Sequence, residues 1–187
     1  MLYLSKGAIL KKSTLKELNV TLYGTNYLLT GLGIRLWLAG RFRINDAKEG
    51  KELIYLKKLQ ELGLAEISEK NYTEASYDLL TRCIICPAKL KRIRYPLTNQ
   101  EAQIWKWISQ AGLRLTIGEL VKLFETGTNP SPELLGSHHA QKLTMLLYKD
   151  DLSFDTTLEI KMEQSRYRDT VVDSVLGLLR KKHIILT

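Results

Sequence analysis

The two halves of the chain repeat one short pattern, and this echo constrains the fold more than any other feature. Leu29-Thr30 is followed by Trp37, and Leu97-Thr98 is followed at the same distance by Trp105. Each Leu-Thr pair ends a strand-like run and opens a helix-like run, and each half closes with a leucine-rich helical run and a short apolar tail. Internal similarity of this kind predicts the architecture of a chain before any functional motif is considered. It predicts an internal duplication of one small α+β unit, with both tryptophans at equivalent core positions.

The apolar pattern predicts the elements of the first unit, residues 1–95. Strands are expected at 7–12 and 18–29, broken by a turn at Gly24-Thr25-Asn26. Helices are expected at 32–42, and from a cap at Asn45-Asp46 to residue 62. Two strands at 64–67 and 77–86 would then form a hairpin, which is a wing.

The second unit, residues 96–187, is predicted to contain more helix. Thr98 and Thr116 are expected to cap helices, and Glu119 stands at capping-box spacing from Thr116. A third helix is expected within 131–148, and a final helix from about 168 to 182 precedes a strand at 184–186. Residues 152–166 fit a strand or a helix. When the second half is aligned with the first, residues from about 125 to 167 have no counterpart, so we interpret them as an insertion in the second unit.

This order of elements resembles tandem winged-helix domains. The first half also resembles the winged-helix peptide-recognition domain of ribosomal-peptide-modifying systems, through a first strand at 4–10, a hairpin ending at 27–30, the helix with Trp37 and the closing Leu62-Gly63-Leu64. That resemblance implies binding of a leader peptide by strand addition between the sheet and the last helix. In the second half, the winged-helix resemblance implies that Ser131–Tyr148 is the recognition helix. The predicted fold is α+β, with two winged-helix-like units in tandem and the insertion in the second.

The net charge of +8 lies entirely in the first half of the chain. Residues 1–97 hold 17 Lys and Arg against nine Asp and Glu, whereas residues 98–187 hold 11 of each. A basic surface attracts nucleic acid or an acidic partner, although it also serves solubility.

Two groups of residues are candidates for binding phosphates, bases or an acidic partner. The first is a basic patch, with a plain basic linker as its alternative: Arg41, Arg43, Lys57, Lys58, Lys89, Lys91, Arg92 and Arg94. The second is a polar face of the expected recognition helix, with a merely solvated face as its alternative: Ser137, His138, Gln141 and Lys142. Side chains of these types contact base edges and phosphates in nucleic-acid complexes.

Catalytic and metal-binding signatures are weak. Cys83-Ile84-Ile85-Cys86 has metal-ligand spacing, but strand-like flanks would turn the two sulfurs to opposite faces, and no second cysteine pair follows. The sequence shows no glycine-rich phosphate loop and no nucleophile elbow. We therefore expect no cofactor, no resident metal and no enzyme activity, and interpret both cysteines as buried apolar residues.

These observations leave three function classes open. The leading prediction is a DNA-binding transcriptional regulator that binds double-stranded DNA. The alternative is an accessory module that captures an acidic peptide or protein by strand addition, and the third is a structural adaptor. Two cysteines in a sequence without an export signal predict a cytoplasmic location. No apolar run is long enough to span a membrane, so we expect no membrane partner. A homodimer is also left open.

Overall fold

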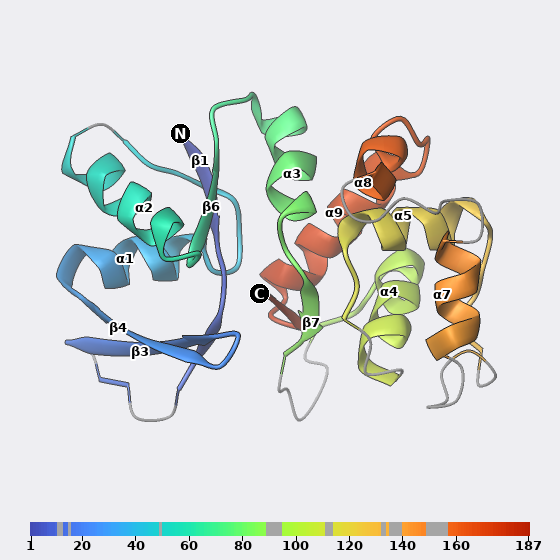
Figure 1. The fold of residues 1–187 in the computed structure, drawn as a ribbon, viewed down its shortest axis with the longest axis horizontal. Helices are drawn as coiled ribbons and strands as arrows, with labels where there is room; N and C mark the ends of the chain where they lie inside the picture. The colour runs from blue at the N-terminus through green and yellow to red at the C-terminus, as the bar shows by residue number, and fades with distance from the viewer. Residues whose placement is uncertain are drawn as a thin grey trace. The chain divides into compact units, whose positions relative to one another are not determined.

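A computed structural model describes residues 1–10, 13–14, 16–48, 50–88, 95–110, 114–131, 134, 140–148 and 157–187 (Figure 1). The chain divides into two compact units. Unit 1 is Met1–Cys83 with Ile185–Thr187, and unit 2 is Ile84–Ile184. The sequence predicts a division after residue 95. Helices and short antiparallel strands together confirm the predicted α+β class.

Six short strands form two antiparallel sheets in unit 1. They are β1 (Leu2–Ser5), β2 (Ala8–Ile9), β3 (Glu17–Leu22), β4 (Thr25–Thr30), β5 (Asn45–Asp46) and β6 (Ala65–Ser68). The strand orders are β5-β1-β6 and β2-β3-β4. Gly7 carries the chain from β1 into β2 with φ +107°, and a Cβ there would lie 2.9 Å from the carbonyl oxygen of Thr21. Only glycine fits this passage.

β3 and β4 form the predicted hairpin, although its turn comes earlier than expected. Tyr23 and Gly24 occupy the turn with φ of 50° and 84°, the two positive values of a type I′ connection. The register places Leu18 opposite Leu29 and Leu22 opposite Thr25. Leu18 and Leu29 are both buried, so this face of the hairpin covers the core of unit 1.

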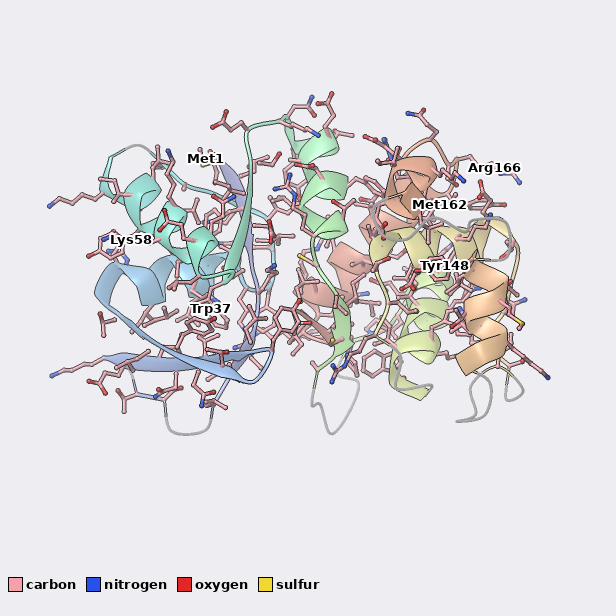
Figure 2. The ribbon with its side chains drawn as sticks, viewed as in Figure 1. Met1, Trp37, Lys58, Tyr148, Met162 and Arg166 are labelled. Carbon is pink, nitrogen blue, oxygen red and sulfur yellow. The ribbon has the colours of Figure 1, made fainter. Side chains whose placement is uncertain are left out.

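The first two helices of unit 1 cover this core. They are α1 (Gly31–Gly40) and α2 (Lys51–Glu61), which pack against each other. Trp37 of α1 is fully buried and lies between its helix and the β3–β4 hairpin (Figure 2). Both helices were predicted, but the expected cap at Asn45-Asp46 is wrong. These two residues form β5, which pairs with β1.

The predicted wing does not form. β6 pairs with β1, and the stretch expected to be its hairpin partner is a helix, α3 (Tyr72–Thr81). The side chain of Asn71 caps this helix by accepting a hydrogen bond from the backbone nitrogen of Glu74 at 3.1 Å. Ala75 and Leu79 are fully buried four residues apart, on one helical face. Helical periodicity therefore prevailed over the β-like composition of residues 77–81, whereas the end of the predicted strand does lie in a strand, β7 (Ile85–Pro87).

Unit 2 is mostly helical. Its described helices are α4 (Asn99–Gln110), α5 (Ile117–Glu125), α7 (Ala140–Tyr148), α8 (Thr157–Met162) and α9 (Arg168–Arg180). Two further strands are β7 (Ile85–Pro87), in unit 2, and β8 (Ile184–Leu186), near the end of the chain. The predicted capping box of Thr116 and Glu119 is present. The ambiguous stretch 152–166 contains α8, and residues 151–156 lie outside the described residues.

The two echoed tryptophans have different surroundings. Trp37 is fully buried, whereas Trp105 is half-buried and lies with its ring centroid 5.4 Å from that of His183. The buried tryptophan of α4 is Trp107, which shares a face with Ile104 and Ile108. The expected equivalence of Trp37 and Trp105 is therefore wrong, while the tandem winged-helix interpretation stays a prediction. No helix in the described part of the chain is long and apolar enough to cross a bilayer.

Candidate peptide-binding surface

β4 is an edge strand of unit 1. β4 stands at one end of the order β2-β3-β4, and none of the described residues forms a strand along its outer side. In a two-residue hairpin the closing pair, here Leu22 and Thr25, is hydrogen-bonded, and such pairs alternate along the ladder. The N–H and C=O groups of Asn26, Leu28 and Thr30 therefore point away from β3.

The side chains of β4 leave this edge unprotected. Its sequence, Thr-Asn-Tyr-Leu-Leu-Thr, holds no charged residue and no proline. Leu28 is 57% exposed, and Tyr27 is half-buried against the core. Proteins usually protect an edge strand with charges, proline or a covering element, because a bare edge pairs with other chains. β4 is thus suited to accept an additional strand.

A shallow hollow lies where β4 passes into α1. It is lined by Lys16, Gly31, Leu32, Ile34 and Arg35, so the charged residues among its described lining are both cations. α1 has no acidic residue in its first turn, and the hydroxyl of Thr30 makes no capping bond. The free amides at a helix N-terminus carry partial positive charge. The hollow therefore favours a carboxylate at this end of β4.

The predicted basic residues of unit 1 fall into two groups. The guanidinium of Arg41 lies 5.1 Å from the Trp37 ring centroid and 4.7 Å from that of Phe42, and burial lowers its pKa. Arg41 is thus held against aromatic rings. Arg43, Lys57 and Lys58 are exposed. Lys57 and Lys58 lie together on α2, and Figure 2 shows Lys58 beside that helix.

The other predicted binding residues belong to unit 2. Lys89, Lys91, Arg92, Arg94, Ser137 and His138 lie outside the described residues. Gln141 and Lys142 belong to α7, where Lys142 is exposed. A role for these residues in binding therefore stays a prediction.

The two cysteines are free thiols, and both are buried. Cys83 follows α3 and Cys86 lies in β7, so the expected continuous strand through both residues is wrong. The Cys83 thiol donates to the carbonyl oxygen of Leu79 at 3.2 Å, and burial raises its pKa to about 12. A protonated, buried thiol is a poor nucleophile and a poor metal ligand. In the described portion, no three His, Cys, Asp or Glu residues cluster as a metal site would require.

Unit 2 contains a buried polar cluster that is explained by its structural contacts. The Glu101 carboxylate accepts hydrogen bonds from the Lys181 ammonium at 2.5 Å and from the Thr98 backbone nitrogen at 2.7 Å. These contacts cap α4 and tie it to the end of α9. The cluster therefore stabilises the fold of unit 2.

A pair of carboxylates near α5 is likewise engaged. The hydroxyl of Tyr148 donates to Glu119 at 2.8 Å, and that of Thr116 donates to Glu159 at 2.7 Å. Burial raises the pKa of Glu119, while the bonds from Thr116 and Tyr148 oppose that shift. These bonds join α5 to α7 and α8.

The residues of the candidate surface are not among the binding residues predicted from the sequence. They are Lys16, Asn26, Leu28, Thr30 and Arg35. The available signal was a six-residue strand without charge next to a helix start without an acidic residue. Comparison with protein-family models, with curated proteins and with solved structures finds no match for the chain.

Proposed function

We propose that unit 1 binds an extended acidic peptide by strand addition along β4, and that the protein presents this peptide to a partner enzyme in the cytoplasm. The observation that carries the proposal is the bare outer edge of β4, six residues long and free of charge. Strand addition uses main-chain hydrogen bonds for affinity and alternate side chains for specificity.

The backbone of β4 offers enough bonds for such a complex. Asn26 and Leu28 each present an N–H and a C=O along the outer edge, and Thr30 adds its N–H, because its C=O accepts the first helical bond of α1. Each added hydrogen bond contributes about 0.5–1.5 kcal/mol net. Leu28 and Tyr27 lie on opposite faces of β4, so alternate side chains of the peptide would meet one or the other.

The preference for an acidic peptide follows from charge. Lys16 and Arg35 line the hollow at the end of β4. Residues 1–83 hold 13 Lys and Arg against nine Asp and Glu, so the whole unit attracts acidic chains. A carboxylate on the peptide would reach the hollow once the strand is paired, and would be held there by both cations.

Duplex DNA, the leading prediction from sequence, is less favoured by the described residues. Arg41 is held against aromatic rings, whereas Arg43, Lys57, Lys58 and Lys142 are exposed. An exposed strand edge offers nothing that duplex DNA needs, but it offers a peptide a complete set of backbone partners. DNA binding is therefore retained as the competing outcome of the experiment.

The experiment measures fluorescence anisotropy of a labelled, end-blocked peptide of alternating valine and glutamate, titrated with the full chain. We expect binding to this peptide, weaker binding to its valine–lysine counterpart, and little binding once prolines replace alternate residues. Lys16→Glu and Arg35→Glu should weaken binding of the acidic peptide. Binding of a labelled duplex with no binding of the peptide would reject the proposal.

A further inference from the structure

α2 exposes apolar side chains on the face that should be polar. Leu56 and Leu59 are buried in the core, as expected for the inner face. On the solvent side, Ile54 is 57% exposed, Tyr55 40% and Leu62, at the C-cap, 45%. Single exposed apolar residues are ordinary, but neighbours along one helix face mark an interaction site.

These residues form one ridge. Ile54, Lys58 and Leu62 are spaced by four, and this spacing produces the helical row that fits the groove of a second helix. The row spans about 12 Å at the rise of an α-helix. The Lys58 ammonium lies 5.3 Å from the ring centroid of Tyr55, so the cation is held beside the row. We define the α2 ridge as Ile54, Tyr55, Lys58 and Leu62.

We infer that the α2 ridge docks an acidic amphipathic helix of a partner protein. The partner must supply an apolar row for Ile54 and Leu62, and carboxylates for the surrounding cations. Those cations are Lys51 and Lys58, both exposed on this side of α2. The inference rests on α2 alone and does not depend on peptide binding at β4.

The charges of α2 favour an acidic helix over two other possible partners, a second copy of the chain and an anionic membrane. A second copy of the chain would place the lysines of one α2 against those of the other, because a two-fold contact pairs the same patch with itself. An anionic membrane would attract the lysines, but Glu52 and Glu61 lie on the same helix and reduce that attraction. A helix can place its carboxylates opposite Lys58 and avoid both glutamates.

The test is a titration of the isotope-labelled full chain with a synthetic helix of leucine, glutamate and alanine, its leucines four residues apart. We expect NMR shifts centred on Ile54, Lys58 and Leu62. Lys58→Glu should weaken binding about tenfold or more, as expected for reversal of one close charge pair. The same variant should bind a helix with lysine in place of glutamate more tightly than the native chain does.

Lys57→Glu is the matched control, since it makes the same charge change on the same helix but off the ridge. It should weaken binding of the acidic helix much less than Lys58→Glu. Equal losses from the two variants would show only general charge attraction and would overturn the inference. Shifts on the ridge with vesicles of phosphatidylglycerol, and none with the acidic helix, would also overturn it.

Discussion

The indole Nε1 of Trp37 donates a hydrogen bond to the backbone carbonyl oxygen of Lys6 at 2.9 Å. This bond fastens α1 to the chain at the passage from β1 into β2. A second bond, from the Tyr3 hydroxyl to the Leu36 carbonyl oxygen at 3.0 Å, fastens the same helix to β1. Because α1 also packs on β4, these contacts support the strand on which the proposed peptide site is built.

Trp37→Phe should destabilise unit 1 by about 2–4 kcal/mol, since it removes ring volume and leaves the Lys6 carbonyl unpaired. Urea unfolding followed by far-ultraviolet circular dichroism measures the change. Trp105→Phe is the matched control and should cost about 1 kcal/mol, because Trp105 is half-buried. A larger loss for Trp105→Phe than for Trp37→Phe would contradict the assignment of Trp37 to the core.

Gly40→Ala should destabilise the protein by about 1–3 kcal/mol, because the added methyl group has no room. A Cβ at Gly40 would lie 2.5 Å from Cε2 of Tyr3 and 2.7 Å from Oγ of Ser5. Gly33 lies in the same helix, and its Cβ would meet nothing within 4 Å. Gly33→Ala should therefore stabilise the protein by about 0.5–1 kcal/mol through helix propensity. Thermal unfolding compares the two, and equal effects would refute the packing of α1 on β1.

Lowering the pH below about 6.5 should destabilise unit 2 through His183. Burial and the neighbouring Lys181 hold the His183 pKa below its ordinary value of 6.5, and Glu101 offsets this only in part. The unfolded chain then binds the proton more readily, so stability is complete above pH 6.5 and is lost as pH falls toward the native pKa.

His183→Phe keeps a ring against Trp105 and should flatten the pH dependence of unfolding in that window. A second loss of stability at low pH arises from Glu101. Burial raises its pKa, but the bonds from Lys181 and Thr98 outweigh burial and leave the pKa lowered, so this loss begins only below about pH 4.5. An unchanged slope between pH 7 and 5 in His183→Phe would assign the effect elsewhere.

Cys83 should be inert in the native protein. With its pKa raised to about 12, the thiol is protonated at pH 8, and it is buried. Cys86→Ser isolates the Cys83 signal for labelling with a disulfide reagent. We expect labelling only as urea unfolds unit 1, and rapid labelling of the native variant would contradict the burial of this thiol.

The sequence predicted those elements whose signals are local. The cap of α5 at Thr116 follows from a hydroxyl and a carboxylate three residues apart, and the β3–β4 hairpin follows from β-forming residues around a glycine. Both depend on contacts within a few residues. Such signals survive folding because tertiary packing reinforces them.

The errors arose where distant contacts or competing periods decided the structure. Asn45 and Asp46 pair with β1, which lies more than forty residues away in sequence, so no nearby residue indicates that β5 forms. The stretch around Leu79 reads as strand by composition, yet the cap at Asn71 and the spacing of Ala75 and Leu79 favour a helix. Both of those signals were present in the sequence.

Trp105 shows that similarity between the halves is a weaker guide than local periodicity. Ile104, Trp107 and Ile108 share one buried face of α4, and Trp105 lies a quarter-turn or more from its centre. The sequence signals the bare edge of β4 only through the lack of charge in that strand, because the absence of a neighbouring strand depends on the whole sheet.

The most direct test of the central claim is amide hydrogen exchange at Leu28, followed by NMR with and without the valine–glutamate peptide. Leu28→Ala keeps the outward N–H and should still bind, whereas Leu28→Pro removes that N–H without removing a bond to β3 and should not. The account predicts that peptide slows exchange at Asn26, Leu28 and Thr30 and leaves Tyr27 and Leu29 unchanged. Binding that leaves exchange at Leu28 unchanged, or that survives Leu28→Pro, would contradict strand addition along β4.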